Sequence, residues 1–214
     1  MKKIALMVFD FDGTLVYSGD DLARSVNHAL GILGLPVLDK EEIIGFVGDG
    51  VAKLIERSLG EEHRDRFDEA MGLFRAHYAE HLLDTTTLCP GVRDTLEHFR
   101  GTKKLIITNK RSDYTLKIAR ALGIAGYFED VVGMNGSSLK KPDPGLLFPF
   151  LERYGAGAAD TVVIGDGIND ILLARNAGTL SCALLNGLGD RAQLLALRPD
   201  YSCESIGELK RLFI

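Results

Sequence analysis

The first apolar segment of the chain places the strongest constraint on its fold. Residues 4–9, Ile-Ala-Leu-Met-Val-Phe, contain no polar side chain and run directly into Asp10, Phe11, Asp12 and Gly13. An apolar run this short predicts a strand that is buried on both faces, as in a parallel sheet, and such strands present reactive groups at their carboxyl ends. Two carboxylates at such a point repel each other unless they share a cation or a proton. The segment therefore predicts either a site for a hard divalent metal ion or an ordinary Asp-Gly turn.

The composition excludes several classes of protein. The chain has 214 residues, enough for a sizeable core without disulfides, and its net charge of −5 gives no broad attraction to nucleic acid or anionic membrane. No apolar stretch is long enough to cross a bilayer, and residues 1–3, Met-Lys-Lys, lead into a strand and not into a signal peptide. The cysteines, Cys89, Cys182 and Cys203, lack metal-ligand spacing, so we expect a reduced, cytoplasmic protein without nucleic-acid or membrane partners. Residues 135–137, Asn-Gly-Ser, match a glycosylation acceptor, which we interpret as a turn.

Residues from about 20 to 83 predict helices and no strand. Apolar side chains recur at helical spacing through residues 20–33 and form one stripe through residues 67–82. Residues 45–50, Gly-Phe-Val-Gly-Asp-Gly, form a glycine-rich loop between two of the helices. We expect helices over residues 20–33, 39–44, 51–59 and 67–82. The segment therefore reads as a helical insert after the first strand.

From Pro90 onward the pattern alternates between strands and helices. We expect strands over residues 104–108, 130–133, 161–165 and 181–184. We expect helices over residues 92–99, 113–122 and 203–213, one ending near 154 and one ending at 177. This alternation implies an α/β fold with a doubly wound parallel sheet, a Rossmann-like core and an inserted helical cap. We expect the core to comprise residues 1–15 and 88–214 and the cap residues 16–87, which can act as a lid because both connectors lie beside the Asp10 turn.

Three predicted strands end in polar side chains that suit one reaction. These side chains are Asp10 and Asp12, Thr108 and Asn109, and Asp166 and Asp170, with Lys141 on the same side of the sheet. Because the carboxyl ends of parallel strands cluster, residues far apart in sequence can meet there. Three carboxylates could hold Mg²⁺, and lysine and threonine can donate to phosphoryl oxygens. Asp12, beside another carboxylate, could stay protonated and serve as a general acid.

Four strings in this order resemble the motifs of the haloacid dehalogenase-like hydrolase superfamily. They are Asp10-Phe-Asp12-Gly-Thr14, Thr108-Asn109, Lys141-Pro-Asp-Pro144 and Gly165-Asp166-Gly-Ile-Asn169-Asp170. The resemblance covers essentially the whole chain, and the insert with its Gly48-Asp49-Gly50 loop resembles the helical cap of the phosphoglycolate phosphatase-like branch. Gly167 stands where that branch often has serine, and the string Gly-Asp-Gly-x-Asn-Asp at residues 165–170 also resembles phosphoserine phosphatases, so the resemblance leaves the substrate open.

The resemblance implies a role for each matched position. Asp10 would attack phosphorus and form an aspartyl-phosphate, while Asp12 would protonate the leaving alkoxide and then deprotonate the hydrolytic water. Thr108 and Lys141 would bind the transferring phosphoryl group. Mg²⁺ would be held by Asp10, the Asp12 backbone carbonyl and Asp166, and Asp170 would orient a metal ligand. The candidates for substrate binding are Asn109, Gly13, Gly48 and Gly50.

The implied function is Mg²⁺-dependent hydrolysis of a small phosphate monoester, with 2-phosphoglycolate as the first candidate. Pyrophosphate, a sugar phosphate, phosphoserine and phosphoryl transfer of the β-phosphoglucomutase type are alternatives with the same chemistry. We expect a small phosphorylated metabolite as the partner. No pattern in the sequence indicates the oligomeric state. Two other classes remain: a zinc peptidase, from the His-x-x-Glu-His match at residues 77–81, and a non-enzymatic phospho-receiver.

Overall fold

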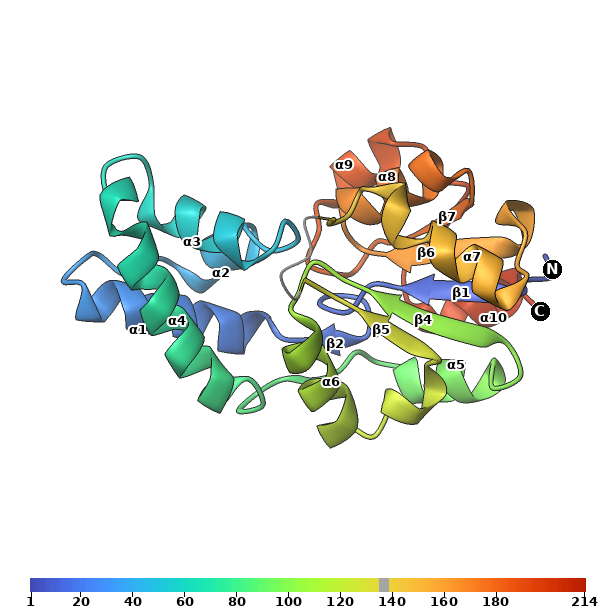
Figure 1. Ribbon diagram of the computed structural model, residues 1–214, viewed down its shortest axis with the longest axis horizontal. Helices are drawn as coiled ribbons and strands as arrows, with labels where there is room; N and C mark the ends of the chain where they lie inside the picture. The colour runs from blue at the N-terminus through green and yellow to red at the C-terminus, as the bar shows by residue number, and fades with distance from the viewer. Residues whose placement is uncertain (135–138) are drawn as a thin grey trace.

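A parallel sheet forms the centre of the protein (Figure 1). The computed structural model describes residues 1–134 and 139–214, so the turn expected at residues 135–137 lies outside the described part. Within that part the six strands lie in the order β5-β4-β1-β6-β7-β8 and are parallel to their neighbours. They are β1 (Leu6–Phe9), β4 (Lys103–Ile107), β5 (Asp130–Val132), β6 (Thr161–Gly165), β7 (Leu180–Leu184) and β8 (Tyr201–Cys203). The predicted α/β fold with a doubly wound parallel sheet is confirmed.

The central strand β1 is buried because helices cover both faces of the sheet. Met7 and Phe9 belong to one apolar cluster with α5 and α6, whereas Leu6 and Val8 belong to a second cluster with α7 and α8. This alternation explains why the strand is apolar at every position. The helices of the core are α5 (Val92–His98), α6 (Ser112–Ala121), α7 (Phe148–Tyr154), α8 (Ile168–Ala177), α9 (Arg191–Ala196) and α10 (Leu209–Leu212).

The register of the three central strands brings their carboxyl ends to one level. Phe9 of β1 pairs with Ile106 of β4 on one side and with Ile164 of β6 on the other. The chain leaves β1 for β4 on one side and later fills β6 on the other, so β1 lies where the winding reverses. Ligands of open α/β sheets bind at such a point.

Four helices form a separate lobe at the carboxyl end of β1 (Figure 1). They are α1 (Gly19–Ile32), α2 (Lys40–Ile44), α3 (Val51–Leu59) and α4 (Phe67–His81). The two connectors pair as short antiparallel strands, β2 (Val16–Tyr17) and β3 (Thr87–Leu88). The buried Asp21 carboxylate accepts hydrogen bonds from the backbone and hydroxyl groups of Thr85 and Thr86, which ties the second connector to α1. We call this lobe the cap; its division from the core at residues 16 and 87 stays a prediction.

Several elements differ from expectation. The helix expected over residues 203–213 is wrong: strand β8 runs to Cys203, a 3-10 turn covers Ile206–Glu208 and α10 contains only Leu209–Leu212. Strands β2 and β3 and helix α9 were not predicted. Two- and three-residue strands carry no periodic signal, and they exist here because a partner strand supplies their hydrogen bonds. No helix of the described residues is both long and apolar enough to cross a membrane.

Candidate active site

Three carboxylates meet at the carboxyl ends of β1 and β6. Asp10 follows β1, Asp166 follows β6 and Asp170 lies in the first turn of α8; one oxygen from each lies within 4.8 Å of the other two. Asp166 and Asp170 are almost fully buried. The structure thus brings together three acidic side chains that the sequence placed at two different strand ends.

The conformation around Asp166 depends on the turn after β1. Its Oδ1 accepts a hydrogen bond from the Thr14 hydroxyl at 2.6 Å, and its Oδ2 accepts one from the Leu188 amide at 2.8 Å. Gly13 has φ +84°, and a Cβ at this position would lie 2.0 Å from Asp166 Oδ2. A side chain at Gly13 would therefore displace the carboxylate. Gly13, a predicted substrate-binding residue, therefore packs against Asp166 and does not line the cavity described below.

Lys141 joins two of the three carboxylates. Its Nζ lies 2.7 Å from Asp10 Oδ1 and 2.6 Å from Asp170 Oδ1, and its side chain is 2% exposed. The contact with Asp10 is an ion pair outside hydrogen-bond geometry, whereas Asp170 accepts a hydrogen bond. Burial by itself would lower the pKa of Lys141, but the charges of Asp10 and Asp170 raise it above its ordinary value. The lysine is therefore a permanent cation within the cluster.

One lysine does not neutralise three carboxylates. Burial, and then the charge of Asp10, raise the pKa of Asp166 to about 6 and that of Asp170 to about 7. Each ionised carboxylate here lacks the solvation that water would supply. The cluster is therefore suited to a further cation.

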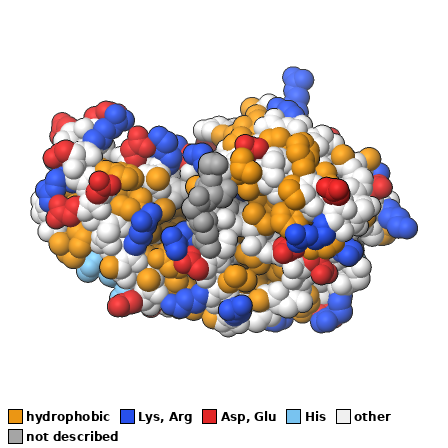
Figure 2. All heavy atoms as spheres, in the orientation of Figure 1, with side chains coloured by type: hydrophobic (Ala, Val, Ile, Leu, Met, Phe, Trp, Pro, Cys, Tyr) orange, Lys and Arg blue, Asp and Glu red, His pale blue; other side chains and the backbone are white. Residues whose placement is uncertain are grey.

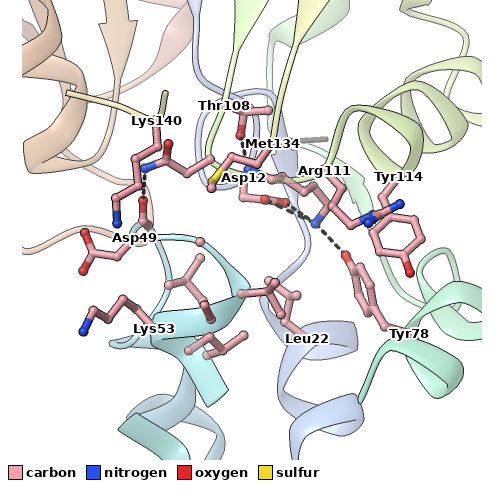
Figure 3. A pocket seen from close by; sticks show the side chains of 18 of the residues that line it. Asp12, Leu22, Asp49, Lys53, Tyr78, Thr108, Arg111, Tyr114, Met134 and Lys140 are labelled. Atoms are coloured by element: carbon pink, nitrogen blue, oxygen red, sulfur yellow. Dashed lines mark hydrogen bonds and ion pairs between the residues drawn. The ribbon is translucent and has the colours of Figure 1, made fainter. Parts of the chain in front are cut away.

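The Asp12 side chain makes a different set of contacts. Both of its oxygens lie near Lys110 Nζ, at 3.0 and 3.2 Å, and its Oδ1 accepts a hydrogen bond from the Ser18 hydroxyl. Figure 3 shows Asp12 joined to a lysine ammonium that also contacts Tyr78. Sequence reasoning did not select Ser18, Lys110 or Tyr78. The only available signals were the lysine after Thr108-Asn109 and a tyrosine within the apolar stripe of α4.

A cavity of about 540 Å³ separates the core from the cap (Figure 3). Its wall includes the predicted Thr108 and Asn109 from the core and Gly48 and Gly50 from the cap loop. The wall also carries apolar and aromatic side chains and the carboxylates of Asp10, Asp12 and Asp49, and its cations are Lys53, Arg75, Lys110, Arg111 and Lys140. Away from the cavity, the face shown in Figure 2 intersperses acidic and basic side chains over both lobes.

Asn109 connects the cavity wall to the carboxylate cluster. Its Oδ1 accepts a hydrogen bond from the Lys141 amide at 2.9 Å, and its Nδ2 donates to the Gly48 carbonyl at 3.0 Å. A second contact between cap and core joins Asn169 Nδ2 to Asp49 Oδ1 at 2.7 Å. The predicted glycine loop therefore lies against the core beside the carboxylate cluster.

The histidines that suggested a zinc peptidase do not form a metal site in the described part of the chain. The His77 and His81 rings stack on each other with centroids 4.1 Å apart. His77 Nδ1 contacts the Ser25 hydroxyl, and His81 Nδ1 contacts Asp84. Among the residues that the structure describes, the only three His, Cys, Asp or Glu side chains close enough to share a metal are the three aspartates of the cluster.

Comparison with known proteins agrees with this arrangement. The family described as haloacid dehalogenase-like hydrolase matches residues 7–184. The chain is 35% identical to a phosphoglycolate phosphatase of Vibrio parahaemolyticus, over 97% of this chain and 95% of the relative. It is 37% identical to a phosphoglycolate phosphatase of Chromobacterium violaceum, over 98% of this chain and 96% of the relative. A crystal structure of a predicted phosphoglycolate phosphatase from Haemophilus somnus matches with a TM-score of 0.91 and 26% identity, over 99% of both chains. The chain belongs to the haloacid dehalogenase-like hydrolase family.

Proposed function

We propose that this protein is a Mg²⁺-dependent phosphatase of small phosphate monoesters, with 2-phosphoglycolate as its first candidate substrate. The observation that carries the proposal is the buried cluster of Asp10, Asp166, Asp170 and Lys141 next to a cavity covered by helices. The full-length similarity to phosphoglycolate phosphatases supports the choice of substrate. The three cysteines form no disulfide, which supports a cytoplasmic location. The similarity to phosphoglycolate phosphatases supports a small phosphorylated metabolite as partner.

The carboxylate cluster fits a hard divalent cation. One oxygen from each carboxylate lies within 4.8 Å of the other two, and burial together with mutual repulsion raises the pKa of two of the carboxyls. Asp10, Asp166 and the Asp12 carbonyl would hold Mg²⁺, with Asp170 orienting the ligands. When bound, Mg²⁺ offsets the negative charge that the nucleophile and the phosphoryl group bring together.

The first half of the reaction uses side chains from the ends of β1 and β4 and from the loop that carries Lys141. The Asp10 carboxylate attacks phosphorus, the bond between phosphorus and the ester oxygen breaks, and Asp12 gives its proton to the departing oxygen. Lys141, 2.7 Å from Asp10 Oδ1, keeps the nucleophile in place. The Thr108 hydroxyl accepts a hydrogen bond from the Lys110 amide at 3.2 Å, so it can direct its own proton toward a phosphoryl oxygen.

The second half of the reaction returns the enzyme to its initial state. Asp12, now ionised, takes a proton from water as the water oxygen attacks the phosphorus of the aspartyl-phosphate. The acyl phosphate bond breaks, inorganic phosphate leaves and Asp10 regains its carboxylate. The same side chain thus acts as acid and then as base.

The cap serves as a lid in this proposal. Its loop contacts the core through Gly48 and Asp49, and the cavity lies beneath it. A covered site excludes bulk water while the aspartyl-phosphate exists. We take residues 16–87 as the cap and residues 1–15 with 88–214 as the core.

The size of the cavity favours a second candidate function. A volume of about 540 Å³ exceeds the needs of a two-carbon acid and lies in the range of pockets for larger organic ligands. A sugar phosphate is therefore the second candidate, hydrolysed by the same residues.

A screen of small phosphate esters tests these assignments. The purified protein is assayed with Mg²⁺ and with a chelator against 2-phosphoglycolate, sugar phosphates, phosphoserine and pyrophosphate, and the substrates are ranked by kcat/KM. We expect 2-phosphoglycolate to rank first and the chelator to abolish turnover. A stable phosphoprotein without turnover would indicate a receiver, and zinc-dependent cleavage of peptides would indicate a peptidase; either result would overturn the proposal.

A further inference from the structure

The general acid of the proposed reaction has two side-chain partners, and both connect it to the cap. Lys110 Nζ reaches both oxygens of Asp12, and the hydroxyl of Ser18, the residue that precedes α1, donates to one of them. The side chains of Lys110 and Asp12 are only 7% and 12% exposed. Two donors on one carboxylate fix its rotation as well as its position.

Lys110 is in turn held by the cap. Its ammonium donates to the Tyr78 hydroxyl at 2.6 Å, and Tyr78 lies on α4 with 1% of its surface exposed. The Tyr78 ring stacks on Phe74 at 5.3 Å and meets the edge of Tyr114 at 5.5 Å. The hydroxyl is thus placed by the packing of its ring between Phe74 of the cap and Tyr114 of core helix α6.

From these contacts we propose that Tyr78 and Lys110 act as a positioning pair that aims Asp12 at the leaving oxygen while the cap lies on the core. Tyr78 fixes the position of the Lys110 ammonium, and the ammonium fixes the orientation of the Asp12 carboxyl group. Neither residue donates a proton to the substrate; Asp12 takes up a proton before it serves as the acid, and this proton goes to the departing oxygen. The inference rests on the proposed function only in taking Asp12 as the acid.

The physical reason lies in the length of the lysine side chain. A lysine has several rotatable bonds, and confining it costs conformational entropy. With Asp12 as its only partner, the Lys110 ammonium could move together with the Asp12 carboxyl group. A second partner on the other lobe, Tyr78, restricts this movement. If the cap moved away, Tyr78 would leave with it and Asp12 would lose its orientation. The acid would then be ready only in the covered site, where the leaving group is held.

Tyr78→Phe tests the pair because it removes one hydroxyl and keeps the ring. The rate of the first turnover is measured with two substrates: 2-phosphoglycolate, whose alkoxide needs a proton, and p-nitrophenyl phosphate, whose phenolate leaves without one. We expect about a tenfold loss for 2-phosphoglycolate, with KM nearly unchanged, and less than about a threefold loss for p-nitrophenyl phosphate. Equal losses for both esters would overturn the inference.

Tyr114→Phe is the matched control. Its hydroxyl lies in the same region but contacts the Arg75 carbonyl at 3.5 Å instead of Lys110. We expect this variant to leave the ratio of the two first-turnover rates unchanged. A ratio that shifts as it does in Tyr78→Phe would mean that any lost hydroxyl disturbs the cavity, and the inference would fail.

A double-mutant cycle decides whether Tyr78 acts through Lys110. Lys110→Met should lower the same ratio by more than Tyr78→Phe does, and adding Tyr78→Phe to it should change the ratio no further. Losses that multiply would overturn the pair. If Lys110→Met fails to fold by circular dichroism, Asp12→Asn takes its place as the background, with the same two outcomes. Absence of turnover by the wild-type protein on every ester would remove the proposed function, whereas wild-type turnover with substrate-independent losses would remove only this inference.

Discussion

The core edge and the cap contribute to the cavity in different ways. At the core edge the three carboxylates of the cluster are held by partners from the core itself, as Asp166 is by Thr14 and the Leu188 amide. The cap contributes apolar side chains, a loop carbonyl at Gly48 and the buried hydroxyl of Tyr78. The core can therefore place Asp10, Asp166 and Asp170 without the cap, whereas the cap determines the room around the substrate and the orientation of Asp12. Changes at the core edge should accordingly lower the rate for every ester. Changes in the cap loop should chiefly alter affinity, and the loss of the Tyr78 hydroxyl should lower the rate only for esters whose leaving group needs a proton.

Asp10→Asn should have the largest effect. The amide keeps the shape of the side chain but cannot attack phosphorus, so we expect turnover to fall by about 10⁴-fold or more. Lys141 keeps Asp170 as a partner, so the variant should fold, as checked by circular dichroism and melting temperature. Residual activity within tenfold of wild type would mean that the nucleophile lies elsewhere.

Asp12→Ala should separate substrates by their leaving groups. General acid catalysis contributes about 10²- to 10⁴-fold, so we expect the first turnover of 2-phosphoglycolate to slow by that order. For p-nitrophenyl phosphate the first turnover should slow least, because its phenolate needs no proton. The measurement is the pre-steady-state rate with each ester, and equal losses would remove Asp12 from the role of acid.

Gly13→Ala and Gly34→Ala compare the two regions with the same change. Both glycines have positive φ, +84° and +70°, so alanine strains the backbone at each. At Gly13 the new Cβ would also lie 2.0 Å from Asp166 Oδ2, whereas at Gly34, in the cap, no atom lies within 4 Å. We expect both variants to lose stability and only Gly13→Ala to lose kcat, by about 100-fold, because placement on the ångström scale matters at the reacting centre. Equal activities would mean that the turn does not position Asp166.

Mg²⁺ should stabilise the core, and more so as the pH rises. The pKa of Asp166 is raised from its ordinary value of 3.8 to about 6 and that of Asp170 to about 7, so the folded, metal-free protein binds protons that the unfolded chain releases. The contribution of these two carboxyl groups to the stability of the folded protein is greatest at low pH and is lost as the pH rises through their folded-state pKa values. Mg²⁺ competes with those protons, so the increase in melting temperature on adding Mg²⁺ should grow between about pH 5 and pH 8. An increase that is independent of pH would place the cation elsewhere.

Asp49→Ala should have the smallest effect. It removes the contact with Asn169 at 2.7 Å between cap and core. Exposed polar contacts contribute about 0.2–1 kcal/mol, so we expect KM to rise by roughly twofold to fivefold with kcat little changed. Asn169→Ala should give the same rise, and the double variant should add nothing. A loss of kcat comparable to that of Gly13→Ala would show that the cap loop takes part in the chemistry.

Sequence reasoning succeeded where one local pattern decides the outcome. The apolar run before Asp10 permits only a strand buried on both faces, and the register of three such strands brings Asp10 and Asp166 together. Reasoning from the sequence failed at β8 and missed α9. The three residues of β8 form a strand because β7 offers them a partner, and no periodicity records that.

The sequence by itself determined the order of the longer strands and helices from β1 to β7, the helical insert and the acidic, hydroxyl and lysine side chains near the strand ends. Those features follow from apolar spacing and from residues that stand directly after a strand. Only the tertiary structure decided that Asp12 turns toward Lys110 and that Tyr78 of the cap holds this lysine. Helical spacing says which face of α4 is buried, but the partner of each buried group depends on where the cap packs against the core.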